Sequence, residues 1–297
     1  MQSSLNPGKC GRQPHFVVCL KQVPDSAQIT VHPVTNTIMR QGVPTIVNPY
    51  DLFALEEALR WKDLLGARVT ALSMGPPMAE DILKKAISFG ADEAILVTDK
   101  AFAGADTLAT SCALAAAIRK IDESQPVDVV FTGKQTIDGD TAQVGPGLAV
   151  RLDAQLLSYV SRIESIDPLS RRIVVERRAE GGVQVLGTRM PCVITMLEGT
   201  NIMRFANMPD MFKAARYAVP NWDRIAAGIT DVTTIGLKGS PTMVSQVYGP
   251  SPRAVRVEVL EGETLTAVCD ALVDKIFECQ PRLAQALGAE AAVEETA

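Results

Sequence analysis

The sequence predicts an α/β protein with a doubly wound, mainly parallel sheet, an antiparallel extension and a C-terminal arm. Three observations predict this fold class. Apolar, strand-like runs alternate with amphipathic helical segments over residues 16–152, which is typical of a parallel sheet with crossover helices. Glycine, proline and small residues gather where each of these strands ends. Beyond residue 152, shorter alternating segments follow one another as in an antiparallel meander.

The first half of the chain contains an alternating series of predicted strands and helices. Gly66 and Gly90 follow two helical patterns, at positions where glycine commonly ends a helix. Pro146 fits the first turn of a helix, because proline lacks the N–H that a helix interior requires. The expected strands are Phe16–Lys21, Arg68–Met74, Ala94–Thr98 and Val127–Thr132, and the expected helices are Tyr50–Leu65, Met78–Phe89, Asp106–Ile121 and one from about Gln143–Gly145 to Leu152.

The rest of the chain divides into an extension and an arm. In the first half, a short alternating segment at Ile29–His32 also predicts a hairpin. In the second half, Asn221–Pro252 has no clear periodicity. The later elements are expected at Gln155–Ile163, Arg171–Glu180, Gly182–Leu186 and Met190–Leu197 as strands, and at Asn207–Tyr217 and Leu265–Phe277 as helices. We therefore expect a flexible tail over residues 1–15, an α/β domain over residues 16–218, and an arm with a helix over residues 219–297.

Composition excludes several classes of function. With 297 residues, 47% of them hydrophobic, the chain can form one large or two small globular domains. A net charge of −5 without a basic tract argues against nucleic-acid binding, and the apolar runs are too short to insert into a membrane. The N-terminal residues lack the apolar core of a secretory signal, so we expect a cytoplasmic protein. Six scattered cysteines and two histidines argue against a metal site and a histidine-based triad.

The stretch Gly133–Ala149 is the most informative part of the chain. It follows a buried strand and leads into a helix, so its backbone N–H groups favour an anion such as a phosphate. It matches neither a Walker A loop nor G-x-G-x-x-G, and on its own a plain structural turn explains it equally well. Lys134 is a candidate phosphate partner. Asp138 and Asp140 are better interpreted as braces of the loop than as ligands.

Three other loops strengthen the interpretation of a ligand site. In an open parallel sheet, ligands bind beyond the carboxyl ends of the strands, near the point where the strand order reverses. The loops expected at that edge are Lys21–Asp25, Met74–Pro77, Asp99–Thr107 and Gly133–Val144. The sequence shows no nucleophile–base pair and no carboxylate pair, so we expect no catalytic side chain of its own. A bound cofactor would then carry the chemistry.

Taken together, several segments resemble the beta subunit of electron-transfer flavoproteins. They run in order over residues 16–216 and comprise VVCLKQVPD (Val17–Asp25), VNPYDLFALEEALR (Val47–Arg60), ALSMGPP (Ala71–Pro77), FGADEAILVTD (Phe89–Asp99), GKQTIDGDTAQVGP (Gly133–Pro146), VERRAEGGVQVL (Val175–Leu186) and NMPDMFKAAR (Asn207–Arg216). The closer resemblance is to the Fix-type, electron-bifurcating branch. It is carried by VHPVTNTIMRQGVP (Val31–Pro44), FAGADT (Phe102–Thr107) and GLKGSPT (Gly236–Thr242).

The resemblance implies a sheet of the adenine-nucleotide-binding type, so that residues 16–218 form a nucleotide- or FAD-binding domain. It implies an obligate alpha-subunit partner, which the C-terminal arm and helix would contact. It also implies AMP in the cleft of ordinary members and FAD in bifurcating members. In the latter, FAD takes a hydride from NADH. One electron passes to ferredoxin or flavodoxin, and the other passes through the alpha-subunit FAD to a quinone oxidoreductase or dehydrogenase. Such partners would place the cytoplasmic subunit at a membrane only indirectly.

The resemblance also implies which residues bind the cofactor. They are Cys19, Asn48, Pro49, Tyr50, Asp51, Met74 and the loop Gly133, Lys134, Gln135, Thr136, Ile137, Asp138, Gly139, Asp140, Thr141, Ala142, Gln143 and Val144, with Asp106 and Thr107 near the flavin in the bifurcating branch. One stretch departs from the family. Where members usually have an Asn-Glu-Pro-Arg core, tied to partner docking, this chain has Asn201-Ile202-Met203-Arg204.

Two alternatives stand beside the bifurcating subunit. An ordinary beta subunit would hold AMP in the same cleft without a redox role there. A nucleotide-binding sensor of the universal-stress type would share the sheet, bind ATP without flavin and need no alpha subunit. The strands and arm after Leu152 speak against the sensor, because a small sensor does not need them.

Overall fold

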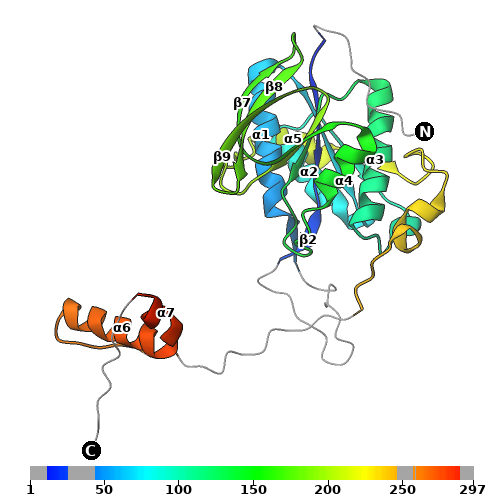
Figure 1. Cartoon of the computed structure of the whole chain (residues 1–297). Coiled ribbons are helices and arrows are strands. Elements are labelled where there is room, and N and C mark those ends of the chain that lie inside the picture. Colours follow the sequence, from blue (N-terminus) through cyan, green and yellow to red (C-terminus); the bar gives the residue numbers. More distant parts are fainter. Residues whose placement is uncertain (1–11, 26–43, 246–256, 258, 288–297) are drawn as a thin grey trace, which may run out of the picture. The chain divides into compact units, whose positions relative to one another are not determined.

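The computed structural model describes residues 12–25, 44–245, 257 and 259–287. Their centre is a nine-stranded sheet in the order β11-β5-β4-β1-β6-β10-β7-β8-β9 (Figure 1). Its strands are β1 (His15–Cys19), β4 (Arg68–Met74), β5 (Glu93–Val97), β6 (Val129–Gly133), β7 (Gln155–Asp167), β8 (Arg172–Ala179), β9 (Gly182–Arg189), β10 (Cys192–Met196) and β11 (Asn221–Trp222). Pairing is parallel from β11 to β7 and antiparallel from β7 to β9. The expected fold class is confirmed.

Helices cover both faces of the parallel part (Figure 1). One face packs against α1 (Pro49–Leu65), α2 (Glu80–Phe89) and α5 (Met208–Arg216), and the other against α3 (Thr107–Ser124) and α4 (Val144–Leu152). Strand β1 shows why the four residues after His15 are apolar. Phe16 and Val18 face the first layer, whereas Val17 and Cys19 face the second, so both sides of the strand are buried.

The strand order reverses at β1. The chain passes from β1 through α1 to β4 and through α2 to β5 on one side, and α3 then returns it to β6 on the other side of β1. Short helices η2 (Pro77–Ala79) and η3 (Lys100–Phe102) follow β4 and β5. The carboxyl ends of β1 and β6 therefore form the switch point at which open α/β sheets bind ligands.

The segment after β1 differs from the expected loop. Within Lys21–Asp25, β2 (Gln22–Pro24) pairs antiparallel with β3 (Thr45–Val47). Strands this short carry no detectable periodicity, and their pairing joins residues that lie apart in the sequence. The hairpin expected at Ile29–His32 lies outside the described residues.

The N-terminal segment is attached to the domain from residue 12 onward. Arg12 Nη2 lies 2.8 Å from Asp128 Oδ1, and Gln13 Nε2 donates to the carbonyl oxygen of Gly66 at 2.7 Å. Residues 12–15 therefore do not behave as the tail expected over residues 1–15. The physical reason is the ion pair with Asp128, a buried carboxylate that also pairs with Arg171 at 2.9 Å.

The irregular stretch after α5 belongs largely to the same unit as the sheet. Strand β11 pairs with β5, and Ala227, Ile229 and Ile235 are buried in the layer that contains α3. Two short helices, η4 (Val232–Thr234) and η5 (Gly236–Gly239), follow. The first compact unit ends at residue 248 and the second begins at residue 249. The expected arm, in contrast, began at residue 219. Single apolar residues that fill gaps in a neighbouring core leave no periodic pattern to detect.

The second unit contains α6 (Leu265–Cys279) and α7 (Pro281–Ala286). Thr264 caps α6, since its Oγ1 accepts from the N–H of Ala267 at 3.2 Å. The helix expected over Leu265–Phe277 is confirmed, and α7 was not predicted. None of the residues of these two helices is buried.

Candidate functional site

The loop Gly133–Val144 follows β6 and is held from outside by the start of α1. Asn48 is fully buried, and its amide bonds twice to the loop backbone. Its Nδ2 donates to the carbonyl oxygen of Gln135 at 2.9 Å, and its Oδ1 accepts from the N–H of Ile137 at 3.2 Å. Because one side-chain amide satisfies a carbonyl and an N–H of the same turn, Asn48 fixes the shape of the loop.

Asp51 joins the ends of β1 and β6. Its carboxylate accepts from the N–H of Lys21 at 2.8 Å and from the N–H of Gly133 at 3.2 Å. Gly133 has no room for a side chain, since a Cβ there would lie 2.6 Å from Asp51 Oδ1. Burial raises the pKa of Asp51 to about 7, although hydrogen bonds from Asn48, Lys21 and Gly133 act in the opposite direction.

Charged side chains also brace the loop. Lys21 Nζ lies 2.8 Å from both carboxylate oxygens of Asp138, and Gln135 Nε2 donates to Asp140 Oδ1 at 2.8 Å. Asp140 and Ala142 adopt left-handed backbone conformations, with φ values of 51° and 54°. Turns of this kind bring backbone N–H groups together around an anion. Both aspartates thus make contacts of the bracing kind expected for them.

Lys134 already has two partners. Its Nζ lies 3.2 Å from Glu198 Oε2 and 5.1 Å from the centre of the Tyr50 ring. Glu198 also lies 3.7 Å from Arg178 Nη1, on β8 of the antiparallel extension. An anion at Lys134 would therefore compete with the carboxylate of Glu198 for the same ammonium group.

Two helix N-termini meet beside the loop. Helix α3 begins at Thr107 and α4 at Val144, and Thr107 Oγ1 donates to Gln143 Oε1 at 2.7 Å. The helices approach closely, because a Cβ at Gly147 would lie 2.8 Å from Ser111 Oγ. Adjacent N-termini bring two positive dipole ends together, which favours a negatively charged group.

The carboxylate of Asp106 is shared between the N-terminus of α3 and Thr242. Its Oδ1 caps α3 by accepting from the N–H of Ala109 at 3.0 Å, and its Oδ2 accepts from Thr242 Oγ1 at 2.8 Å. Burial raises the pKa of Asp106, but the hydrogen bonds from Ala109 and Thr242 outweigh burial, and the net shift is downward. The N-cap expected at Asp106 or Ala105 is therefore Asp106.

Apolar side chains stand at two strand ends. Cys19 ends β1 and is buried, and Met74 ends β4 and packs against the layer that contains α3. Burial, together with the nearby carboxylate of Asp51, raises the pKa of the Cys19 thiol. This cysteine is therefore a neutral, apolar contact surface and not a thiolate nucleophile.

Comparison with known proteins decides the family. A family model described as "Electron transfer flavoprotein domain" matches residues 35–226. "Protein FixA" of Azotobacter vinelandii is 64% identical over 279 residues, which cover 93% of this chain and 99% of that protein. "Electron transfer flavoprotein subunit beta" of Clostridium acetobutylicum is 45% identical over 232 residues, with 78% and 86% covered.

This chain belongs to the electron-transfer flavoprotein family. Within the family it is a Fix-type beta subunit, because proteins named FixA from Azotobacter vinelandii and Azorhizobium caulinodans share 64% and 60% of their residues with it. The family binds flavin or AMP, and its beta subunits pair with an alpha subunit. None of the described helices is long and apolar enough to cross a membrane. Among the described residues, no cluster of His, Cys, Asp and Glu is suited to a metal ion.

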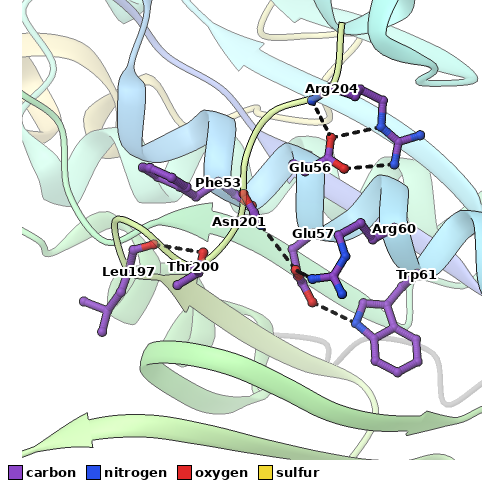
Figure 2. A network of polar contacts seen from close by, with 9 residues as sticks. All are labelled: Phe53, Glu56, Glu57, Arg60, Trp61, Leu197, Thr200, Asn201 and Arg204. Atoms are coloured by element: carbon purple, nitrogen blue, oxygen red, sulfur yellow. Dashed lines mark hydrogen bonds and ion pairs between the residues drawn. The ribbon is translucent and has the colours of Figure 1, made fainter.

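The stretch that departs from the family pattern is anchored to α1 (Figure 2). The backbone N–H and guanidinium of Arg204 donate to the buried carboxylate of Glu56 at 2.9–3.1 Å. Asn201 Nδ2 donates to Glu57 Oε2 at 3.2 Å, and Trp61 Nε1 donates to the same carboxylate at 3.0 Å. The two family residues retained here, Asn201 and Arg204, are thus the anchors.

The replaced residues have different surroundings. Ile202 is 91% exposed, whereas Met203 packs against the layer that contains α1. Near them, a groove of about 690 Å³ lies between α2, α5 and residues 203–206. The substitution therefore preserves the attachment of this segment and changes the surface that it presents.

Sequence reasoning assigned no individual role to four residues around the site: Lys21, Glu198, Ser240 and Thr242. Lys21 belongs to the quoted segment Val17–Asp25, and its position directly after β1 was the available signal. The other three come from segments distant in sequence, and only the folded chain brings them to the loops.

Proposed function

We propose that this chain holds FAD at the carboxyl ends of β1 and β6 and takes part in the bifurcation of electrons from NADH. The observation that carries the proposal is the meeting of the α3 and α4 N-termini beside a loop braced by Asn48, Asp51 and Lys21. FAD, when bound, supplies the acceptor for the hydride of NADH. One electron would pass to ferredoxin or flavodoxin and the other, through the alpha subunit, to a quinone oxidoreductase or dehydrogenase.

The residues present fit a dinucleotide. The helix N-termini and the loop backbone offer N–H groups for the pyrophosphate, with Lys134 as an added positive charge. Cys19 and Met74 offer apolar surface for the adenine. Thr107 stands at the α3 N-terminus, on the side where the resemblance places the flavin. Asn48, Asp51 and Asp138 support the loop through hydrogen bonds and act as positioning residues.

The resemblance to the Fix-type branch favours FAD over AMP in this cleft. The experiment is cofactor extraction from the purified heterodimer of this chain and its alpha subunit. Two FAD per heterodimer support the proposal, and one FAD with one AMP contradicts it.

A site variant sharpens this experiment. Asn48→Ala removes both side-chain bonds to the loop, so it should lower the flavin content from two to one per heterodimer. Asn207→Ala removes the exposed cap of α5, where Asn207 Oδ1 accepts from Asp210 N at 2.8 Å, and should retain both flavins. Equal flavin loss in the two variants would contradict the placement of the cofactor at this loop.

We infer that residues 202–212 receive the quinone oxidoreductase or dehydrogenase. Phe205 is 98% exposed, and Met208, Met211 and Phe212 continue an exposed apolar surface beside the groove. The buried Glu56 and Glu57 hold the preceding segment in place, so this surface is rigidly presented. Phe205→Ser should slow electron transfer to the acceptor and leave flavin content unchanged, whereas Leu169→Ser, at an exposed turn, should alter neither.

The second unit supplies a surface for the alpha subunit. Leu265, Leu272, Val273 and Ile276 are exposed on α6, and no residue of α6 or α7 is buried. An amphipathic helix with an exposed apolar side favours a protein partner. Replacing Leu272 and Ile276 with serine should lower the yield of heterodimer in co-purification. An unchanged yield would contradict this assignment.

A further inference from the structure

Two segments that mark the Fix-type branch contact each other. Residues 102–107 lie in the wall of the candidate site, and residues 236–242 come from the region after the sheet. Leu237 N donates to the carbonyl oxygen of Ala103 at 3.2 Å. A Cβ at Gly104 would lie 2.6 Å from Leu237 Cγ, and one at Gly236 would overlap the carbonyl oxygen of Ala101. Both glycines have positive φ, so each segment is shaped to receive the other.

Asp106 is the centre of this contact. Its N–H donates to Ser240 Oγ at 2.8 Å, and Ser240 Oγ donates in turn to the carbonyl oxygen of Gly236 at 2.7 Å. Asp106 Oδ2 accepts from both the hydroxyl and the N–H of Thr242, at 2.8 and 3.2 Å. We call Asp106, Ser240 and Thr242 the latch.

The latch stands next to the nucleotide loop. Thr107, the neighbour of Asp106, donates to Gln143 at the start of α4. Thr242 lies a few residues before residue 249, where the second unit begins. The same short loop therefore contacts the candidate site on one side and the last part of the first unit on the other.

We propose that Asp106 is a positioning residue that couples the nucleotide site to residues 236–242 through the latch. Nucleotide binding orders this segment, and the ordered segment in turn strengthens nucleotide binding. The two effects must be equal in free energy, because coupling between two sites is reciprocal. The identity of the nucleotide, FAD, rests on the proposed function.

The test compares two valine variants in the heterodimer with its alpha subunit. Thr242→Val keeps the size of the side chain and removes the hydroxyl bond to Asp106. Thr233→Val is the matched control, since Thr233 Oγ1 donates to Asp231 Oδ1 at 2.6 Å within its own turn. We expect Thr242→Val to raise the Kd for FAD about fivefold to tenfold, the size of one ordinary hydrogen bond. Thr233→Val should leave the Kd unchanged.

Hydrogen exchange gives a readout independent of activity. In the unaltered heterodimer, added FAD should slow amide exchange at residues 236–242, and Thr242→Val should abolish this protection. Asp106→Asn should also abolish this protection. The double variant Asp106→Asn/Thr242→Val should lose no more protection and no more FAD affinity than Asp106→Asn alone, because both changes break the same contact.

Two results would overturn the proposal: a Thr242→Val variant that matches Thr233→Val in Kd and exchange, or additive effects in the double variant. Failure of the proposed function has a different signature. If the heterodimer carries AMP in this subunit, the same exchange comparison with AMP as the probe still supports or overturns the latch.

Discussion

Lys21 and Asp138 lie 117 positions apart in the sequence and form a bidentate ion pair, with Nζ 2.8 Å from each carboxylate oxygen. The pair ties the chain after β1 to the loop after β6. We expect Lys21→Met to weaken nucleotide binding about twofold to fivefold, since a pair with an exposed lysine is worth about 1 kcal/mol or less. Calorimetric titration of FAD into the flavin-depleted heterodimer measures this change.

Lys120→Met is the control for this prediction. Lys120 pairs with Glu123 at 2.6 Å on the exposed part of α3. Its loss should leave nucleotide affinity unchanged. An equal effect of the two lysine variants would show that charge in general, and not the bracing of the loop, determines affinity.

Asn48→Ala should destabilise the domain as well as the cofactor site. The buried amide satisfies the carbonyl of Gln135 and the N–H of Ile137, so its removal leaves two loop groups without a partner. The expected loss is about 1–3 kcal/mol in the free energy of unfolding, measured by urea denaturation. Asn207→Ala, which removes a helix cap, should cost about 1 kcal/mol. A larger loss of unfolding free energy in Asn207→Ala than in Asn48→Ala would contradict the conclusion that Asn48 fixes the shape of the loop.

Gly145→Ala should be costly although it lies within a helix. A Cβ at Gly145 would overlap Thr195 Cγ2 and lie 3.0 Å from Thr132 Oγ1, so overpacking of about 1–3 kcal/mol is expected. Gly139→Ala is the control in the same loop, because its Cβ would lie 3.5 Å from Thr136 Oγ1, an ordinary contact. Thermal unfolding separates the two. Thr195→Ser removes Cγ2, so adding it should partly restore the stability of the Gly145→Ala variant. If it does not, the steric strain does not come from Thr195.

Asp51 should make stability depend on pH in the neutral range. Its pKa is about 7 in the folded chain against 3.8 for an ordinary aspartate. Cys19 and Lys21 are the titratable groups that act on it. Between these pH values the folded chain binds a proton that the unfolded chain has released. Stability therefore falls as the pH rises toward 7, by at most about 1.4 kcal/mol per pH unit.

Denaturation of Asp51→Asn at pH 5, 6, 7 and 8 tests this dependence. The stability of this variant should no longer fall between pH 5 and pH 7. The control variant Asp231→Asn, at an exposed turn, should keep the pH dependence of the unaltered protein. Parallel stability curves for the unaltered protein and Asp51→Asn would contradict the raised pKa of Asp51.

The sequence alone determined the sheet and the edge at which the site lies. Burial on both faces makes β1 apolar from Phe16 to Cys19, and glycine or proline marks helix ends such as Gly66, Gly90 and Pro146. These signals are local and periodic, so they survive without the fold. The resemblance added the family, which the comparisons show, and selected the loops that surround the site.

Only the tertiary structure decided the partners of the charged and polar side chains. Lys134 pairs with Glu198, and Asp106 bonds to Thr242 across 136 positions of the chain. The early arm residues Ala227 and Ile235 fill a core that no pattern connected to them. Hydrogen bonds and single buried contacts have no periodicity, and they form between residues that only the folded sheet brings together. For that reason the sequence determined where the candidate loop lies, whereas the fold decided what holds it.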